Sequence, residues 1–285
     1  MADNKDKKVL NVPALRFPEF TEEWEEHYLA EYLDFKNGLN PSANKFGSGI
    51  KFISVMDILN NDFITYDCIR TSVEITPEEQ VAFAVEKGDM LFQRSSETLE
   101  DVGRANVYMD DRPAVFGGFV IRGKKKAEYN PMFFRYLLAS PYARKKVIPM
   151  GAGAQHFNIG QDGLSKVKLH FPILQEQQKI ADLLRLINER ISTQNKIIEK
   201  LETLIKGFVD SIFTANKFPK VPFKEIYVRA GEGGTPATSN PEYYDNGTIP
   251  FIKIDDLQNK YIKTNKDCIT ELGLQKSSAW IVPAN

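Results

Sequence analysis

The chain has 285 residues, of which 42% are hydrophobic and 26% charged, and its 37 basic and 38 acidic side chains leave a formal net charge of −1. This length favours about two domains, and this composition is typical of an ordinary globular protein rather than a disordered or collagen-like one. The sequence contains no run of about 18 apolar residues, the length that a transmembrane helix requires, and we expect no membrane partner.

The chain opens with a polar segment of mixed charge, MADNKDKKVLNV. It lacks the apolar core of a signal peptide, so we expect residues 1–11 to form a disordered tail and the protein to be cytoplasmic. Residues 17–34 then carry seven acidic side chains and no lysine or arginine, whereas residues 122–168 carry ten basic and two acidic ones. The basic stretch indicates a face for an anionic polymer, although a solvated surface neutralised by acidic neighbours is the plainer interpretation.

Short alternating runs rich in valine, isoleucine, phenylalanine and tyrosine predict strands at 51–55, 90–93, 114–121 and 250–254. Residues 131–147, PMFFRYLLASPYARKKV, predict a helix with Pro131 in its first turn and an interruption near Pro141. The fold class is therefore α+β, with a strand-rich domain over residues 12–172.

The clearest pattern follows Pro172, where one side of a predicted helix over 173–215 is apolar. The seam residues recur at steps of four and three, and they are Ile180, Leu184, Ile187, Ile191, Gln194, Ile198, Leu201, Ile205, Phe208 and Ile212. At ~1.5 Å per residue the seam is about 50 Å long, and it predicts a coiled coil with a second helix. The alternative is a long helix packed on its own domain. Gln194, the only polar member, is a residue type that fixes register.

The sequence then repeats itself. Residues 249–269, IPFIKIDDLQNKYIKTNKDCI, follow residues 50–69, IKFISVMDILNNDFITYDCI, after about 200 residues, a period that indicates a duplicated domain rather than a solenoid. Cys68 and Cys268 fall at matching places in separate copies, so we expect no disulfide between them. Residues 216–285 are then a second copy that we expect to be truncated, which would leave the seam without an intramolecular partner and favour a homodimer through this helix.

Several segments together resemble the specificity subunit of type I restriction–modification systems. They are LRFPEFTEEW at 15–24, EKGDMLFQRSS at 86–96, NPMFFRYLLAS at 130–140, GAGAQHFNIGQDGLSKVKLHFPILQEQQKIADLL at 151–184 and GGTPATSNPEYYDNGTIPFIKIDDL at 233–257. The resemblance implies two target-recognition domains that each read half of a split DNA sequence, separated by spacer helices. It also implies docking of methyltransferase subunits that bind S-adenosylmethionine, a restriction subunit that joins this core, and no catalysis by the specificity subunit itself.

A protein that reads a DNA sequence presents hydrogen-bond donors and acceptors to the base edges, and its lysines and arginines contact the phosphates. The candidates for DNA contact follow predicted strands or a glycine-rich run, and they are Gln93, Arg94, Ser95, Ser96, Lys124, Lys125, Lys126, Gln155, His156 and Asn158. Arg94 suits guanine or a phosphate, and an internal salt bridge is its alternative role. The three lysines suit phosphates, and a charged hairpin turn is their alternative.

Enzyme signatures do not emerge from the sequence. The three histidines have no zinc-ligand spacing, no nucleotide-binding glycine motif or GxSxG is present, and Asp255-Asp256 is matched by a single aspartate, Asp57, in the first copy. We therefore predict no metal, no cofactor on this chain and no catalytic residue. The alternative function is a non-catalytic coiled-coil adaptor whose flanking domains bind protein.

Overall fold

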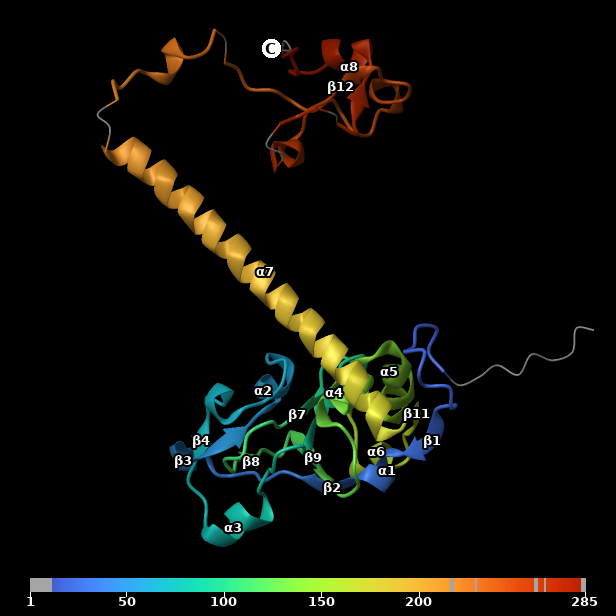
Figure 1. Cartoon of the computed structure of the whole chain (residues 1–285). Helices are drawn as coiled ribbons and strands as arrows, with labels where there is room; N and C mark the ends of the chain where they lie inside the picture. Colours follow the sequence, from blue (N-terminus) through green and yellow to red (C-terminus); the bar gives the residue numbers. More distant parts are fainter. Residues whose placement is uncertain (1–11, 216–217, 229, 259–260, 264, 283–285) are drawn as a thin grey trace, which may run out of the picture. The chain divides into compact units, whose positions relative to one another are not determined.

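The computed structural model describes residues 12–215, 218–228, 230–258, 261–263 and 265–282 (Figure 1). The chain divides into two compact units, Met1–Leu201 and Glu202–Asn285, and the division falls inside the long helix α7 (Leu174–Ala215). The tail predicted at residues 1–11 lies outside the described residues. Helix α7 runs over 42 residues without interruption and confirms the predicted spacer helix.

The first unit mixes short strands with short helices, which confirms the α+β class. Its strands are β1 (Glu25–Tyr28), β2 (Leu33–Asn37), β3 (Phe46–Ile53), β4 (Ser72–Val73), β5 (Met90–Gln93), β6 (Ser95–Ser96), β7 (Ala105–Val107), β8 (Val115–Phe116), β9 (Val120–Lys125), β10 (Phe157–Asn158) and β11 (Lys168–Phe171). Its helices before α7 are α1 (Leu29–Tyr32), α2 (Val55–Leu59), α3 (Pro77–Ala82), α4 (Pro131–Ala139), α5 (Pro141–Val147) and α6 (Gln161–Ser165).

The central sheet has the strand order β2-β9-β5-β7, with every neighbouring pair antiparallel. A second sheet has the order β4-β3-β8, in which β3 and β8 run parallel. Every residue of β5 is buried, because Met90 and Phe92 point to one hydrophobic cluster and Leu91 points to another on the opposite face. Alternation of side chains along a strand thus places β5 between two layers of the core.

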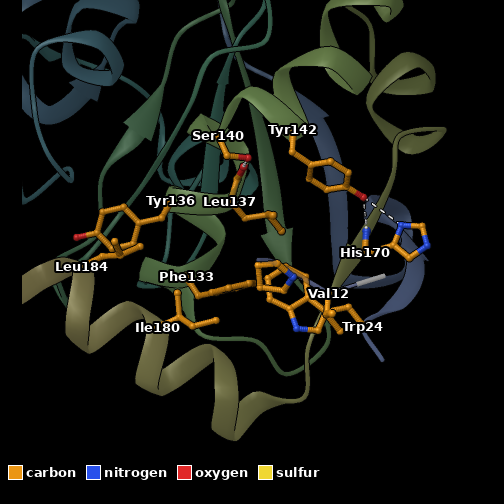
Figure 2. Close-up of a pocket in the computed structure, with 11 residues that line it drawn as sticks. Val12, Trp24, Phe133, Tyr136, Leu137, Ser140, Tyr142, His170, Ile180 and Leu184 are labelled. Atoms are coloured by element: carbon orange, nitrogen blue, oxygen red, sulfur yellow. Dashed lines mark hydrogen bonds between the residues drawn. The ribbon is translucent and has the colours of Figure 1, made fainter. Parts of the chain in front are cut away.

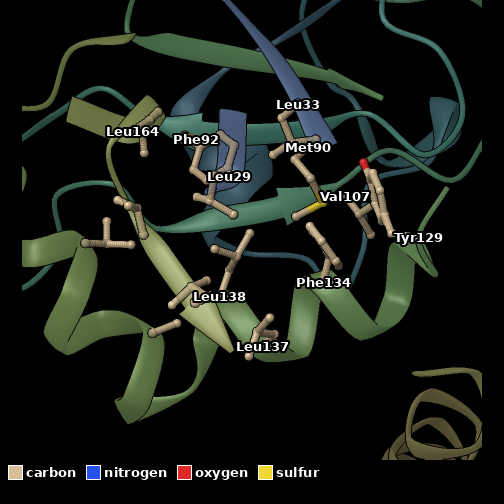
Figure 3. Close-up of a cluster of buried hydrophobic side chains, with 14 of the residues drawn as sticks. Leu29, Leu33, Met90, Phe92, Val107, Tyr129, Phe134, Leu137, Leu138 and Leu164 are labelled. Atoms are coloured by element: carbon tan, nitrogen blue, oxygen red, sulfur yellow. The ribbon is translucent and has the colours of Figure 1, made fainter. Parts of the chain in front are cut away.

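Helix α4 covers one face of the central sheet (Figure 3). It begins after Asn130, whose side-chain oxygen accepts the backbone N–H of Phe133 at 2.8 Å, and Phe134 and Leu138 from its inner face are buried against the sheet. Ser140 ends α4 and caps α5 by accepting the backbone N–H of Ala143 at 3.2 Å. The predicted interruption near Pro141 is therefore confirmed, because the helix is split there in two.

The first turn of α7 is fastened to the N-terminal segment by a buried ion pair. Arg16 donates from Nε and Nη2 to the two carboxylate oxygens of Glu176, at 2.7 and 2.6 Å, and Trp24 donates its indole N–H to the same group at 3.3 Å. Glu176 is 0% exposed. The pairing with Glu176 raises the pKa of Arg16, so the guanidinium stays charged. Both halves of this clamp lie in segments that carry the family resemblance.

The second unit contains a small hairpin and a short helix. Strand β12 (Ile249–Pro250) pairs antiparallel with β13 (Cys268–Ile269), and α8 (Glu271–Gln275) follows. The counterpart of α2 is a 3-10 helix over Ile254–Gln258. In the first unit Asp57 accepts the backbone N–H of Ser54 at 2.7 Å, and Asp256 accepts that of Lys253 at 2.8 Å. The duplication therefore extends to the side chain that caps the turn.

The predicted alignment of the two cysteines is wrong. Strand β3 pairs Lys51 with Ser72, whereas β12 pairs Pro250 with Cys268, so Cys268 occupies the place of Ser72 rather than that of Cys68. The second copy is shorter between the paired strands, and the Asp-Cys-Ile match in the sequence is a coincidence of that shortening. Both cysteines are free thiols. Asn259, which the sequence match also aligned, lies outside the described residues.

Candidate nucleic-acid interface

Two loops that the sequence separates by about sixty residues meet in a two-stranded ribbon, β6 with β10. Ser95 lies opposite Asn158, and its hydroxyl donates to the Asn158 side-chain oxygen at 2.5 Å. Ser96 lies opposite Phe157 and is buried. Of the predicted DNA contacts, the serine loop and the glycine-rich loop are therefore brought together on one element.

Arg94 lies at the base of this ribbon. Its backbone N–H donates to the carbonyl of Phe119 at 2.9 Å, and Nη1 of its half-buried side chain donates to the carbonyl of Gly118 at 3.3 Å. The contact to Gly118 uses one of five guanidinium N–H donors. The contact differs from the internal salt bridge that was the alternative role of Arg94, because the acceptor is the neutral carbonyl of Gly118.

Gln93 differs from the other candidates because it belongs to the core. It is 5% exposed, its amide donates to the carbonyl of Ser95 at 2.9 Å, and its side-chain oxygen is buried without a hydrogen-bond partner. Its role is to hold the strand end from which Ser95 projects. The alternation of the fully buried strand β5 could have revealed this from the sequence, since Gln93 ends that strand.

The turn before β10 presents Gln155 and His156 to solvent. Ala152 and Asn158 exchange two backbone hydrogen bonds of 2.9 Å and close this turn. Gly153 has a φ of 149°, and a Cβ built on it would lie 1.9 Å from the carbonyl oxygen of His156. A glycine is therefore required at this position, because only a residue without a side chain permits such a close backbone approach.

The three lysines lie elsewhere. Strand β9 pairs with Gln93 at Val120, its first residue, whereas Lys124 and Lys125 are at its other end. Lys124 forms an ion pair with Glu86 at 3.0 Å and Lys125 one with Glu128 at 3.1 Å. Lys126 donates its backbone N–H to the carbonyl of Tyr32 at 3.0 Å. Lys124 and Lys125 are thus paired with acidic neighbours, and their position at the far end of β9 separates them from the ribbon.

The beginning of the α7 seam is partly covered by the first unit. Ile180 packs against the main core cluster and Leu184 is half-buried, whereas the apolar members from Ile187 to Ile212 are exposed in the single chain. The exposed apolar surface is wider than the seam, because it also includes Leu183, Leu186, Ile197, Leu204, Val209 and Phe213. A stripe this broad is typical of a helix that packs against more than one neighbour.

An apolar cavity of about 510 Å³ lies beside the first turns of α7, within the first unit (Figure 2). Ile180 and Leu184 of the seam form one wall, and Trp24, Phe133 and Tyr136 contribute to the others. At its far side Tyr142 accepts the backbone N–H of His170 at 2.8 Å, with its hydroxyl 3.1 Å from His170 Nδ1. The cavity therefore continues the apolar seam into the domain.

Two further observations bear on chemistry and membranes. Within the described part of the chain, no cluster of three or more His, Cys, Asp or Glu side chains is arranged to hold a metal ion. No helix of that part combines the length and the apolar character needed to cross a bilayer.

The chain was compared with known proteins. Residues 21–203 match the profile of the type I restriction modification DNA specificity domain. The MjaVIII type I restriction enzyme specificity subunit of Methanocaldococcus jannaschii is 23% identical over 202 residues, which cover 69% of this chain and 47% of that protein. The HindI specificity subunit of Haemophilus influenzae is 28% identical over 169 residues, covering 58% of this chain and 35% of that protein.

Among solved structures, the HsdS subunit from Thermoanaerobacter tengcongensis aligns with a TM-score of 0.47 and 19% sequence identity, over 71% of this chain and 47% of that one. The chain spans about half the length of the curated relatives it matches first, 52% and 47%. The profile match extends over more than half of the chain, from β1 through most of α7. The chain therefore belongs to the type I restriction–modification DNA specificity domain family.

Proposed function

We propose that this chain is a DNA specificity subunit of a type I restriction–modification complex, and that its first unit binds one half of a bipartite double-stranded target. The observation that carries the proposal is the β6–β10 ribbon with the turn before β10. Ser95 and Asn158 on the ribbon, and Gln155 and His156 on the turn, offer donors and acceptors close together. Such groups read base edges in a groove, whereas a catalytic reaction would require a nucleophile or a general base within reach of a substrate.

The chemistry of the complex would then reside on other subunits. The methyltransferase subunits would bind S-adenosylmethionine and dock on α7, and the restriction subunit would join through that core. The exposed apolar residues beside the seam, such as Leu183, Leu186 and Leu204, support such docking because they extend the apolar face of α7 beyond what one partner helix covers. On this proposal the chain itself carries no cofactor.

Helix α7 is further proposed to pair antiparallel with α7 of a second copy. The seam residues alternate between the two apolar heptad positions, a and d. When the two helices are aligned end to end, each a residue lies opposite a d residue of the other copy, so Ile187 lies opposite Ile205 and Ile191 opposite Leu201. Gln194 then lies beside Ile198 near the two-fold axis. The seam residue Phe208 of one copy reaches Leu184 of the other, at the mouth of the apolar cavity. The pairing therefore buries the exposed seam along its whole length.

The proposal is tested with the chain in complex with its cognate methyltransferase. Methylation profiling of the host gives the target sequence, and gel-shift titrations then compare a duplex that carries it with a scrambled duplex. We expect tighter binding of the target by at least ~10³-fold, the lower end for specific over non-specific DNA binding. Binding of the methyltransferase without any DNA preference would contradict the proposal and support the coiled-coil adaptor.

Arg94→Ala is expected to weaken binding of the target by about 1–3 kcal/mol, because a guanidinium at the base of the ribbon can contact a base edge or a phosphate. The measurement is a competition titration of the complex with target and scrambled duplexes. Arg70→Ala is the matched control, since Arg70 is an exposed arginine between the strands β3 and β4. An affinity and a sequence preference equal to those of the unaltered protein would remove Arg94 from the interface.

A further inference from the structure

A second, polar cavity of about 400 Å³ lies in the first unit, and three arginines line it. Arg104 immediately precedes β7, Arg135 comes from α4 and Arg144 comes from α5. Helices α4 and α5 follow one another directly, whereas Arg104 comes from an earlier part of the chain that meets them only in the fold. Arg135 and Arg144 account for part of the basic excess between residues 122 and 168, while Arg104 lies outside that stretch.

The guanidinium of Arg144 is fixed by two hydrogen bonds, and one of its terminal nitrogens has no hydrogen-bond acceptor. Its Nη2 donates to the carbonyls of Glu100 and Val102, at 2.7 and 2.6 Å, while its Nη1 is buried and has no hydrogen-bond partner. Burial lowers the pKa of Arg144, and the nearby positive charge of Arg104 lowers it further. A buried cationic N–H group without an acceptor is unfavourable, so an anion that supplied an oxygen here would be stabilised.

The other two arginines are only partly satisfied by the protein. Arg104 is about half exposed and pairs with Asp101 at 2.6 Å. Arg135 donates Nε to the carbonyl of Asp62 at 2.8 Å, which leaves its terminal nitrogens for another partner. Among the residues that line the cavity, the three arginines are accompanied by one carboxylate, that of Glu100. Positive charge is therefore in excess in the lining, even though Arg104 is paired with Asp101.

The cavity adjoins the ribbon. Gln93 donates its backbone N–H to the carbonyl of Arg104 at 2.8 Å and accepts the backbone N–H of Gly103 at 2.9 Å. Arg104, which immediately precedes β7, is therefore paired through its backbone with Gln93, two residues before Ser95. Neighbouring strands are about 4.8 Å apart, so the backbone of Arg104 lies one strand spacing from the chain that leads into the ribbon.

We propose that the cavity lined by Arg104, Arg135 and Arg144 binds an oxyanion of the phosphate class, and that its occupant is a phosphodiester group of the DNA backbone beside the bases read by the ribbon. The planar fork of arginine matches the oxygens of a phosphate, which makes this side chain suited to such a group. The identity of the occupant rests on the proposed function. The interaction fixes the position of the duplex and carries no sequence information.

The anion site is tested first without DNA. Inorganic phosphate at constant ionic strength is expected to raise the Tm of the full chain relative to chloride, and the double variant Arg104→Gln/Arg135→Gln is expected to lose that rise while keeping its Tm in chloride. Arg144 is left unaltered because it supports the loop carbonyls. Equal stabilisation of the two proteins by phosphate, or none of either, would overturn the anion site.

The occupant is tested on the complex with methyltransferase. The double variant should lower the slope of log K against log salt concentration by about 0.9 for each DNA phosphate that it no longer neutralises, and it should weaken target and scrambled duplexes by the same factor. Asp101→Asn frees Arg104 from its carboxylate, so it should tighten both duplexes. An unchanged slope would overturn the assignment of the occupant to a DNA phosphate, even if the cavity binds free phosphate. Failure of the unaltered complex to prefer its target would instead contradict the proposed function, and the phosphate experiment is independent of that result.

Discussion

Leu201→Asp is expected to convert the proposed α7 pair into monomers. In the antiparallel pairing Leu201 lies opposite Ile191 of the second copy, so one substitution places an uncompensated carboxylate in two layers of the seam. An unpaired charge in a buried interface costs about 3–5 kcal/mol, and every 1.4 kcal/mol is a tenfold change in affinity. We therefore expect the dissociation constant of the α7 pair to rise by more than about a hundredfold.

Light scattering and sedimentation at micromolar concentration measure this change. Lys200→Asp is the matched control, because it introduces the same side chain one residue earlier, outside the seam. The control should remain dimeric, with an unaltered helix content for both variants by circular dichroism. A monomeric unaltered protein under the same conditions would contradict the pairing with a second copy.

Glu176→Gln is expected to destabilise the first unit by about 3–5 kcal/mol, the usual cost of breaking a buried ion pair by removing one charge. The substituted amide keeps the shape of the side chain but offers Arg16 one acceptor oxygen instead of two, and its NH₂ group faces a cation. Because the pair joins the N-terminal segment to the first turn of α7, the loss should loosen both.

Urea denaturation followed by tryptophan fluorescence measures this loss, since Trp24 donates to the same carboxylate. Glu189→Gln is the matched control. It makes the same chemical change in the same helix, but Glu189 forms an exposed pair with Arg185 at 2.6 Å, which is worth about 0.3–0.5 kcal/mol. Equal stability of the two variants would contradict a structural role for the Arg16–Glu176 clamp.

Local signals in the sequence predicted local structure well. Asn130 and Pro131 mark the start of α4, Pro141 marks its separation from α5, and the periodic apolar residues mark α7. These features are encoded by neighbouring residues, through capping, the missing N–H of proline and helical periodicity. The duplicated hairpin was also visible, but its register was not, because a deletion shifts the second strand of the pair.

The candidate site was predicted only in part, because it depends on contacts between distant segments. The sequence suggested both loops of the ribbon but could not show that Ser95 lies opposite Asn158. It also suggested Lys124 and Lys125 as phosphate ligands, although each is paired with a glutamate brought near by the fold. The arginine cavity was missed altogether. The basic excess was its only signal, and nothing local distinguishes Arg144 from the lysines that follow it.

The ribbon has a consequence for how this protein can change over time. Gln155 and His156, on the exposed turn that leads into it, lie outside the three buried clusters, whereas Met90 to Phe92 lie between two of them. Exposed substitutions away from cores and caps usually alter stability by less than about 0.5 kcal/mol. On the proposed function, new preferences for DNA would therefore arise by exchange of a few side chains at the ribbon, while the folded scaffold and helix α7 stay as they are.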